Sequence, residues 1–113
     1  MDDPTGQLVA VVVRVAMSGQ PAFQLRKGEQ GLSAFRIGAV DPPLTDDEIL
    51  AAFRPGSIVI HRTAKQVAAM GLQLVTTPGT PNLPDRLQSA HEEIQPSHGM
   101  SRAAFKEKLR ELE

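Results

Sequence analysis

The segment from Gln7 to Met17 constrains the fold of this chain more than any other, because it is crowded with β-branched residues. It contains the run from Val11 to Val13 and stops at Ser18-Gly19-Gln20-Pro21. Branched side chains favour strands, whereas glycine and proline favour turns. We therefore expect a buried strand here. With 113 residues, of which 41% are apolar, the chain can bury one core, so we expect a single domain over residues 1–113.

Shorter stretches with strand character recur along the rest of the chain. We expect strands at Ala22 to Leu25, Leu32 to Ile37, Ser57 to His61, Leu72 to Thr76 and His91 to Gln95. Turn residues separate them, with Asp41-Pro42-Pro43 and Pro55-Gly56 the clearest breaks. The stretch from Thr77 to Pro84 holds three prolines and a glycine, so we expect a loop or lid there.

Two short helices and a terminal helix are expected between these strands. Thr45 and Glu48 have capping-box spacing before Ile49, Leu50 and Phe53, and Thr63 to Met70 has helical spacing closed by Gly71. Ser101 should cap the last helix, whose apolar stripe includes Phe105 and Leu109. The expected fold class is α+β, with a small mixed or antiparallel sheet, two short helices and a C-terminal helix.

Composition argues against several classes of function. The net charge is -1 and phenylalanine is the only aromatic residue type, so we rank a nucleic-acid module last. There is no cysteine, and the three histidines lack the spacing of metal ligands, so we expect no metal site. No apolar run reaches the length of a membrane span, and no cleavable export signal is visible, so we expect a soluble cytoplasmic protein; export by a specialised secretion system stays open.

The segment His91-Glu92-Glu93-Ile94-Gln95 carries the richest chemistry. Strand alternation places His91, Glu93 and Gln95 on one face, and Glu92 and Ile94 on the other. An imidazole and a carboxylate on one surface could move a proton and stabilise a developing positive charge. A solvated strand face would give the same alternation.

Two arginines are candidates for holding an anion. Arg36 ends the apolar stretch Ala34-Phe35-Arg36-Ile37, where its guanidinium could grip a phosphate or could cover apolar neighbours with its stem. Arg62 follows His61 at a strand end, before a helix that Thr63 could cap, which suits an anion site or a plain surface pair.

A family resemblance runs mainly through the C-terminal half. The order of a Pro-Gly strand, a helix, a further strand, PGTPNLPDRLQSAHEEIQP and a closing helix in GMSRAAFKEKLREL resembles the toxin domain of interbacterial type VI secretion effectors. The fold of that domain is like that of ADP-ribosyltransferases. Leu32-Ser33-Ala34-Phe35-Arg36 resembles the family's early strand, which ends in an arginine.

The resemblance implies NAD as a substrate. Arg36 would hold the pyrophosphate, with Arg62 as a further cofactor contact, and His91 would orient the nicotinamide ribose. Glu93, a catalytic candidate from its place on the strand face, would stabilise the transition state. The resemblance also implies a cognate immunity or antitoxin protein as partner. The alternative is a non-catalytic interaction domain, itself a partner protein of a toxin system.

Overall fold

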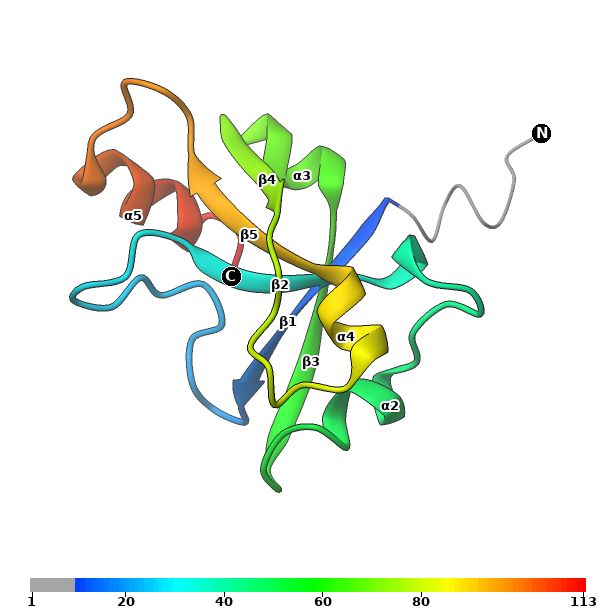
Figure 1. Ribbon diagram of the computed structural model, residues 1–113. Helices are drawn as coiled ribbons and strands as arrows, with labels where there is room; N and C mark the ends of the chain where they lie inside the picture. Colours follow the sequence, from blue (N-terminus) through cyan, green and yellow to red (C-terminus); the bar gives the residue numbers. More distant parts are fainter. Residues whose placement is uncertain (1–9) are drawn as a thin grey trace.

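The computed structural model describes residues 10–113, in which five strands form one antiparallel sheet (Figure 1). The order across the sheet is β3-β1-β2-β5-β4, and each neighbouring pair is antiparallel. The strands are β1 (Val11–Met17), β2 (Leu32–Arg36), β3 (Ser57–Thr63), β4 (Leu72–Thr76) and β5 (His91–Pro96). The α+β fold class is thus confirmed, and the sheet is antiparallel rather than mixed. Residues 7–9 of the predicted first strand lie outside the described residues.

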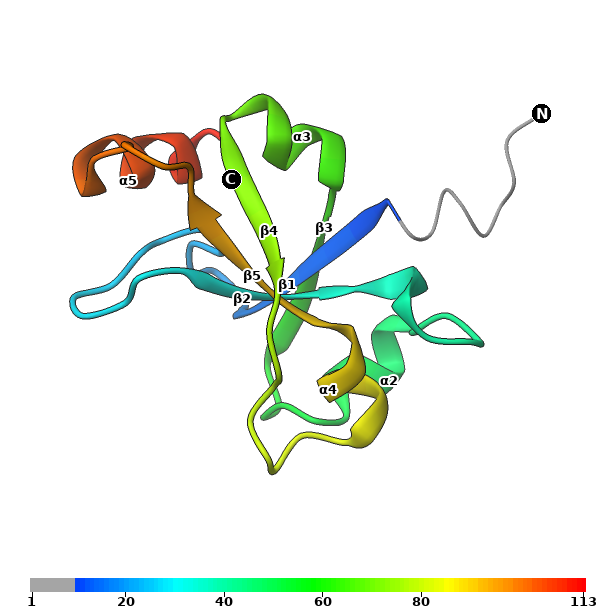
Figure 2. The ribbon, with the colours of Figure 1, turned by 45° about the horizontal axis from the view of Figure 1, so that its top comes forward.

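Helices cover both faces of the sheet, as Figure 2 shows from the side. On one face lie α3 (Ala64–Ala69) and α5 (Arg102–Arg110). On the other face lie α2 (Asp46–Leu50) and α4 (Asp85–Ala90). A 3-10 turn, η1 (Ile37–Ala39), follows β2. The predicted α2, α3 and α5 are confirmed.

The sheet separates two apolar clusters because neighbouring residues of β1 point to opposite faces. Val12 packs in one cluster with Val67 of α3 and Phe105 of α5, whereas Val13 packs in the other with Ile49 of α2 and Leu87 of α4. The first cluster consists of Val12, Ala22, Phe23, Leu25, Leu32, Ala34, Val67, Leu72, Ile94, Phe105, Leu109 and Leu112. The second consists of Val13, Phe35, Ile37, Leu44, Ile49, Leu87 and Ala90.

The strand predicted at Ala22 to Leu25 is wrong, although three of its four residues are buried. The segment forms no ladder with any described strand. Its Ala22 and Phe23 N–H groups donate instead to the Glu113 carboxylate, at 2.7 and 3.1 Å from Oε1. A side chain thus satisfies backbone groups that a neighbouring strand would otherwise bond.

Helix α4 was not predicted, because its signals are weak. It has six residues, and its N-cap, Pro84, makes no side-chain cap hydrogen bond. It directly follows the proline-rich loop and runs without a break into β5. Such a single-turn element depends on packing more than on local propensity, and Leu87 and Ala90 provide that packing in the second cluster.

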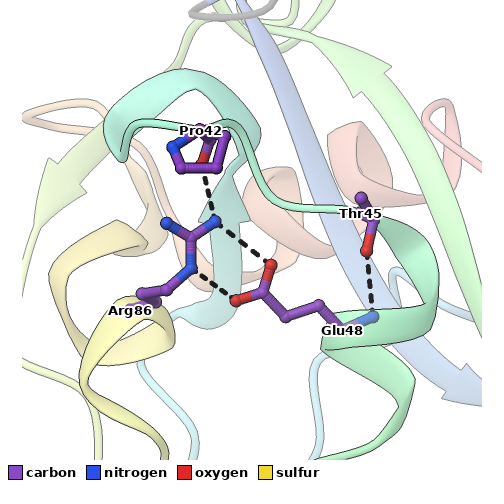
Figure 3. A network of polar contacts seen from close by, with 4 residues as sticks. All are labelled: Pro42, Thr45, Glu48 and Arg86. Carbon is purple, nitrogen blue, oxygen red and sulfur yellow. Dashed lines mark hydrogen bonds and ion pairs between the residues drawn. The ribbon is translucent and has the colours of Figure 1, made fainter.

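Only half of the capping box predicted at α2 forms. The Thr45 hydroxyl accepts the Glu48 N–H at 3.1 Å, but the Glu48 carboxylate turns to Arg86 of α4. Arg86 donates to both Glu48 oxygens, at 2.5 and 3.1 Å, and to the carbonyl of Pro42 at 2.5 Å (Figure 3). This cross-helix clamp joins α2 to α4. A complete capping box forms at α3, between Thr63 and Gln66.

No helix within residues 10–113 is long and apolar enough to cross a membrane.

Candidate functional site

A pocket of about 260 Å³ opens beside the start of β5, on the face that carries α2 and α4. We call it the aromatic pocket. The residues that line it come from five segments of the chain, and they are Arg14, Val15, Ser33, Phe35, Phe53, Thr80, Leu83 and His91. Two aromatic rings, an imidazole, a guanidinium and two hydroxyls therefore converge on one concavity, which is the usual composition of a small-molecule site.

His91 is held in place by the loop in front of it. Its Nδ1 lies 3.1 Å from the Thr77 carbonyl oxygen and 2.9 Å from the Thr77 hydroxyl. The carbonyl can only accept, so we assign the proton of the neutral ring to Nδ1, where it can donate to either Thr77 oxygen. Nε2 is then the unprotonated nitrogen, and no residue within 10–113 bonds it. It is the atom through which His91 can meet a ligand.

The rings of the pocket meet edge to face. Phe35 lies 5.6 Å from His91 at an interplanar angle of 73°, and 6.1 Å from Phe53 at 69°. Such contacts favour fixed ring positions. Phe35 comes from β2, opposite His91 in the ladder, and Phe53 from the turn after α2. The clamp between Arg86 and Glu48 supports this geometry, because it joins α2 to α4, the helix that precedes His91.

The loop from Thr77 to Pro84 forms one wall of the pocket through Thr80 and Leu83. It packs closely on α4 and on the start of β5. A Cβ added to Gly79 would lie 3.3 Å from the Gln88 Cα and 3.5 Å from the His91 Cβ. Gln88 also donates its side-chain amide to the Leu83 carbonyl at 2.7 Å. The predicted loop is therefore confirmed, and it is an anchored wall.

Arg14 fills a gap between β1 and β2. These strands pair only at Val12 with Arg36 and at Val13 with Phe35. Beyond that point the Arg14 guanidinium bridges the two sides, donating to the Ser33 carbonyl at 2.6 Å and to the Ala22 carbonyl at 2.8 Å. Burial lowers the pKa of Arg14 from its usual value, opposed by nearby Glu29 and Glu113. An arginine nonetheless stays charged at neutral pH.

A second concavity, the arginine hollow, shares two lining residues with the aromatic pocket. Its volume is about 550 Å³, and Arg14 and Val15 line both spaces. Arg26 and Arg54 also line the hollow, together with one carboxylate, Glu29. Glu29 accepts the Arg26 backbone N–H at 2.7 Å. Three arginines and a single acidic residue thus line this space.

Glu93 lies next to the aromatic pocket rather than in its wall. It is paired across the sheet with Ser33, which lines the pocket. Its Oε1 accepts from the Gln95 side-chain amide at 3.1 Å, so these two side chains share a face as the alternation predicted. The Glu93 carboxylate lies beside Gly31, on the side of Ser33 away from Phe35, so a ligand in the pocket meets it only by extending past Ser33 toward Gly31.

Arg36 does not share a cleft with His91, contrary to the arrangement expected from the sequence. Its guanidinium bonds both oxygens of Glu92, which is 5% exposed. The bond to Glu92 raises the pKa of Arg36. Glu92 follows His91 directly in the strand and points to the opposite face, so Arg36 lies across the sheet from the imidazole. Strand alternation predicts on which face of the sheet Glu92 lies. It does not predict that Glu92 pairs with Arg36.

Arg62 is also remote from the pocket. It donates to the Leu112 carbonyl at 2.5 Å and to the His61 carbonyl at 2.6 Å, and its guanidinium lies 5.2 Å from the centroid of the Phe23 ring. It therefore fixes the end of the chain against the first cluster. Of the predicted site residues, only His91 lines the aromatic pocket, and Glu93 lies on the same strand face with its carboxylate beside Gly31 and Gln95. Arg14, Arg26 and Arg54 were missed, because only the fold gathers them.

Residues 10–113 contain no cluster of three or more histidine, aspartate or glutamate side chains that could hold a metal ion. In comparisons with protein-family models, curated proteins and solved structures, nothing matched this chain.

Proposed function

We propose that this chain binds a nucleotide, with a planar ring in the aromatic pocket and phosphate groups in the arginine hollow. One observation carries the proposal, namely that Arg14 lines both spaces. A ligand that crosses Arg14 would place an aromatic part on one side of the guanidinium and an anionic part on the other. Nucleotides have this bipartite chemistry.

The sizes of the two spaces support an extended ligand. Small-molecule pockets usually measure about 300–1,000 Å³. The aromatic pocket, at about 260 Å³, suits one ring system, whereas the arginine hollow adds about 550 Å³. Phe35, Phe53 and His91 offer ring faces and edges for stacking.

The charges in the hollow support an anionic group. Arg26 and Arg54 are exposed, and their guanidinium groups bond no residue within 10–113. Guanidinium groups bind phosphate oxygens through paired hydrogen bonds. Arg14 has donors left after its two bonds to carbonyls, because a guanidinium carries five N–H groups.

NAD is the nucleotide that the family resemblance favours, and ADP-ribosyl transfer is the reaction. In this proposal the nicotinamide end occupies the aromatic pocket, His91 bonds the ribose through Nε2, and Glu93 stabilises the positive charge that develops at the ribose carbon. In this proposal Arg14, rather than Arg36, contacts the pyrophosphate. The biological role would be that of an interbacterial toxin domain with a cognate immunity protein.

Calorimetric titration of NAD into the purified chain tests the binding step. His91→Gln and Arg54→Ala should each weaken binding at least tenfold. His61→Gln and Arg110→Ala are matched controls, because both residues are exposed and line neither space, and they should leave binding unchanged. Equal effects in test and control variants, or no binding to the unaltered chain, would reject the proposal. Binding of ADP-ribose but not NAD would keep the site and reject NAD as ligand.

Release of nicotinamide tests the reaction separately. Glu93→Gln keeps the shape of the side chain and its hydrogen bond to Gln95, but it removes the negative charge. We expect unchanged NAD binding and loss of turnover. Retained turnover in this variant would exclude the role proposed for Glu93 while leaving the binding proposal intact.

A non-catalytic interaction domain is the second candidate function. A groove along α5, which shares only Pro21 and Gln24 with the arginine hollow, favours it. This candidate predicts no NAD binding, no growth arrest when the chain is expressed, and a stable complex in cell extract. Growth arrest that disappears in His91→Gln would count against it.

A further inference from the structure

Strand β3 forms one edge of the sheet, and its outer side is open. The ladder with β1 runs without a break from Ser57 to Thr63, and no other strand within residues 10–113 pairs with β3. The strand contains no proline, lysine or bulge, which are features that protect an edge strand from further pairing. The other edge strand, β4, has five residues against seven in β3. β3 is therefore the longer of the two open edges.

The outward backbone groups of β3 follow from its ladder with β1. Alternate residues of an antiparallel strand bond the neighbouring strand, and the residues between them point away from it. The Ala64 N–H donates to the Ala10 carbonyl at the end of this ladder. The even-numbered residues of β3, such as Ile60, therefore bond β1, whereas Val59 and His61 point their N–H and carbonyl groups outward.

The free donors of this edge lie in its middle. At the two ends, the N–H groups of Ser57 and Thr63 donate to neighbouring residues of the same chain, at 3.3 and 2.8 Å. The N–H groups of Val59 and His61 donate to no residue within 10–113. One free donor thus lies on each side of Ile60.

This arrangement matches a second copy of the same strand. In an antiparallel pair with a two-fold axis at Ile60, Val59 of each copy lies opposite His61 of the other copy, and these two residues exchange both N–H···O bonds. The His61 carbonyl already accepts from Arg62 at 2.6 Å, but its second lone pair is available for the new bond. Both free donors of each copy are then satisfied.

Ile58 and a pocket beside Arg62 are complementary in the same register. Ile58 is 42% exposed, and no other large apolar side chain of residues 10–113 is as exposed. The pairing of Val59 with His61 sets Ile58 opposite Arg62 of the second copy, on the same face of the sheet. Arg62 lines a pocket of about 380 Å³, whose wall includes the apolar residues Ala69, Met70 and Leu112. The exposed Ile58 of each copy would therefore lie at the pocket of the other.

We propose that this chain forms a two-fold dimer in which β3 pairs with β3 of a second copy, with Ile60 opposite itself. A second copy fits this edge better than an unrelated strand for two reasons. The free donors are symmetric about Ile60, and Ile58 and the pocket residue Arg62 lie two positions on either side of it. The net charge of -1 opposes association of two copies only weakly.

Sedimentation velocity over a range of concentrations tests the dimer on the whole chain. We expect a monomer–dimer equilibrium whose dissociation constant rises at least tenfold in Ile58→Lys, because a charge on an edge strand opposes pairing. Gln73→Lys is the matched control, because Gln73 is an exposed residue of the other edge strand; it should leave the dissociation constant unchanged. A monomer at every concentration of the unaltered chain, or equal constants in the two variants, would overturn the inference.

Disulfide cross-linking tests the register, because the chain contains no cysteine of its own. Opposite residues at a non-hydrogen-bonded position have Cα atoms about 4.5 Å apart, within the range that a disulfide spans. Oxidised Ile60→Cys should therefore form a covalent dimer. Val59→Cys should not, because Val59 lies opposite His61 and two positions away from Val59 of the second copy. Cross-linking of Val59→Cys as fast as that of Ile60→Cys would contradict the proposed pairing.

The remaining occupant of the edge and the nucleotide site are separable. If the unaltered chain is a monomer that holds a different protein through β3, and Ile58→Lys releases it, the dimer inference is wrong. No residue of β3 lines the aromatic pocket or the arginine hollow. NAD binding should therefore be the same in Ile58→Lys and in the unaltered chain, so failure of the dimer and failure of the proposed function are distinguishable.

Discussion

Arg36 of β2 bonds both carboxylate oxygens of Glu92 of β5, and Glu92 is only 5% exposed. Ala34, and not Arg36, is the direct cross-strand partner of Glu92, so the bond runs diagonally across the ladder. The pair links the two strands at the edge of the core. Arg36, which the sequence analysis proposed as an anion-binding residue, is therefore already paired with a carboxylate of the same chain.

Removal of Arg36 should destabilise the fold more than it affects any ligand. Arg36→Ala leaves a buried carboxylate without its partner, and we expect a loss of about 3 kcal/mol in the free energy of unfolding. The double variant Arg36→Met/Glu92→Met removes both charges and should be the more stable of the two, as urea titration can show. Equal stability of the two variants would show that the unpaired charge is not the cause.

Gly31 provides the space that Glu93 occupies. A Cβ added to Gly31 would lie 2.7 Å from Cγ and 2.8 Å from Cδ of Glu93, closer than real contacts allow. Gly31→Ala should therefore displace the Glu93 side chain, break its bond to Gln95 and cost about 1–2 kcal/mol. Adding Glu93→Ala should restore most of that stability. If Glu93 acts in turnover, Gly31→Ala also lowers turnover without weakening NAD binding.

The clamp between Arg86 and Glu48 should make stability depend on pH in the acidic range. The hydrogen bond from Arg86 lowers the pKa of Glu48. A carboxyl group with a lowered pKa in the folded state contributes stability above its unfolded pKa, near 4.3, and loses it as the pH falls through the lower folded value. Arg86→Ala should be less stable than the unaltered chain at pH 7, and the difference should shrink below about pH 4.

Thermal unfolding from pH 7 to pH 2.5 measures this difference. The control is Lys108→Ala, which removes the exposed pair with Glu111 and should change stability little, because exposed ion pairs contribute about 0–1 kcal/mol. A difference for Arg86→Ala that stays constant down to pH 2.5 would exclude the clamp as its source.

The capping box of α3 should be a local source of stability next to the edge strand β3. The Thr63 hydroxyl accepts the Gln66 N–H at 3.0 Å, and the Gln66 side chain accepts the Thr63 N–H at 2.8 Å. Thr63→Ala should cost about 1 kcal/mol, whereas Thr63→Ser should cost much less, because serine keeps the cap. Chemical denaturation compares the two. Similar losses in both variants would place the effect in the lost methyl group instead.

Although it also predicted a strand at Ala22 to Leu25 that does not form, the sequence alone determined the five segments that form the sheet and three of the four α-helices. Local chemistry suffices for that, since β-branched runs, turn residues and caps such as Thr45, Thr63 and Ser101 act within a few residues of one another. The face shared by His91 and Glu93 was also predictable, because side chains alternate along any strand. The helix at Asp85–Ala90 was not, since packing of Leu87 and Ala90 stabilises it more than its own propensity does.

Only the tertiary structure decided which residues meet. The sheet order brings β2 beside β5, and this pairing sets Phe35 against His91 and Arg36 against Glu92. Arg14, Arg26 and Arg54 gather in one hollow because β1 and β2 part after Val13 and the connection between them folds back. The burial of two apolar clusters on one sheet determines which residues far apart in the sequence come into contact. Local sequence patterns do not predict these contacts.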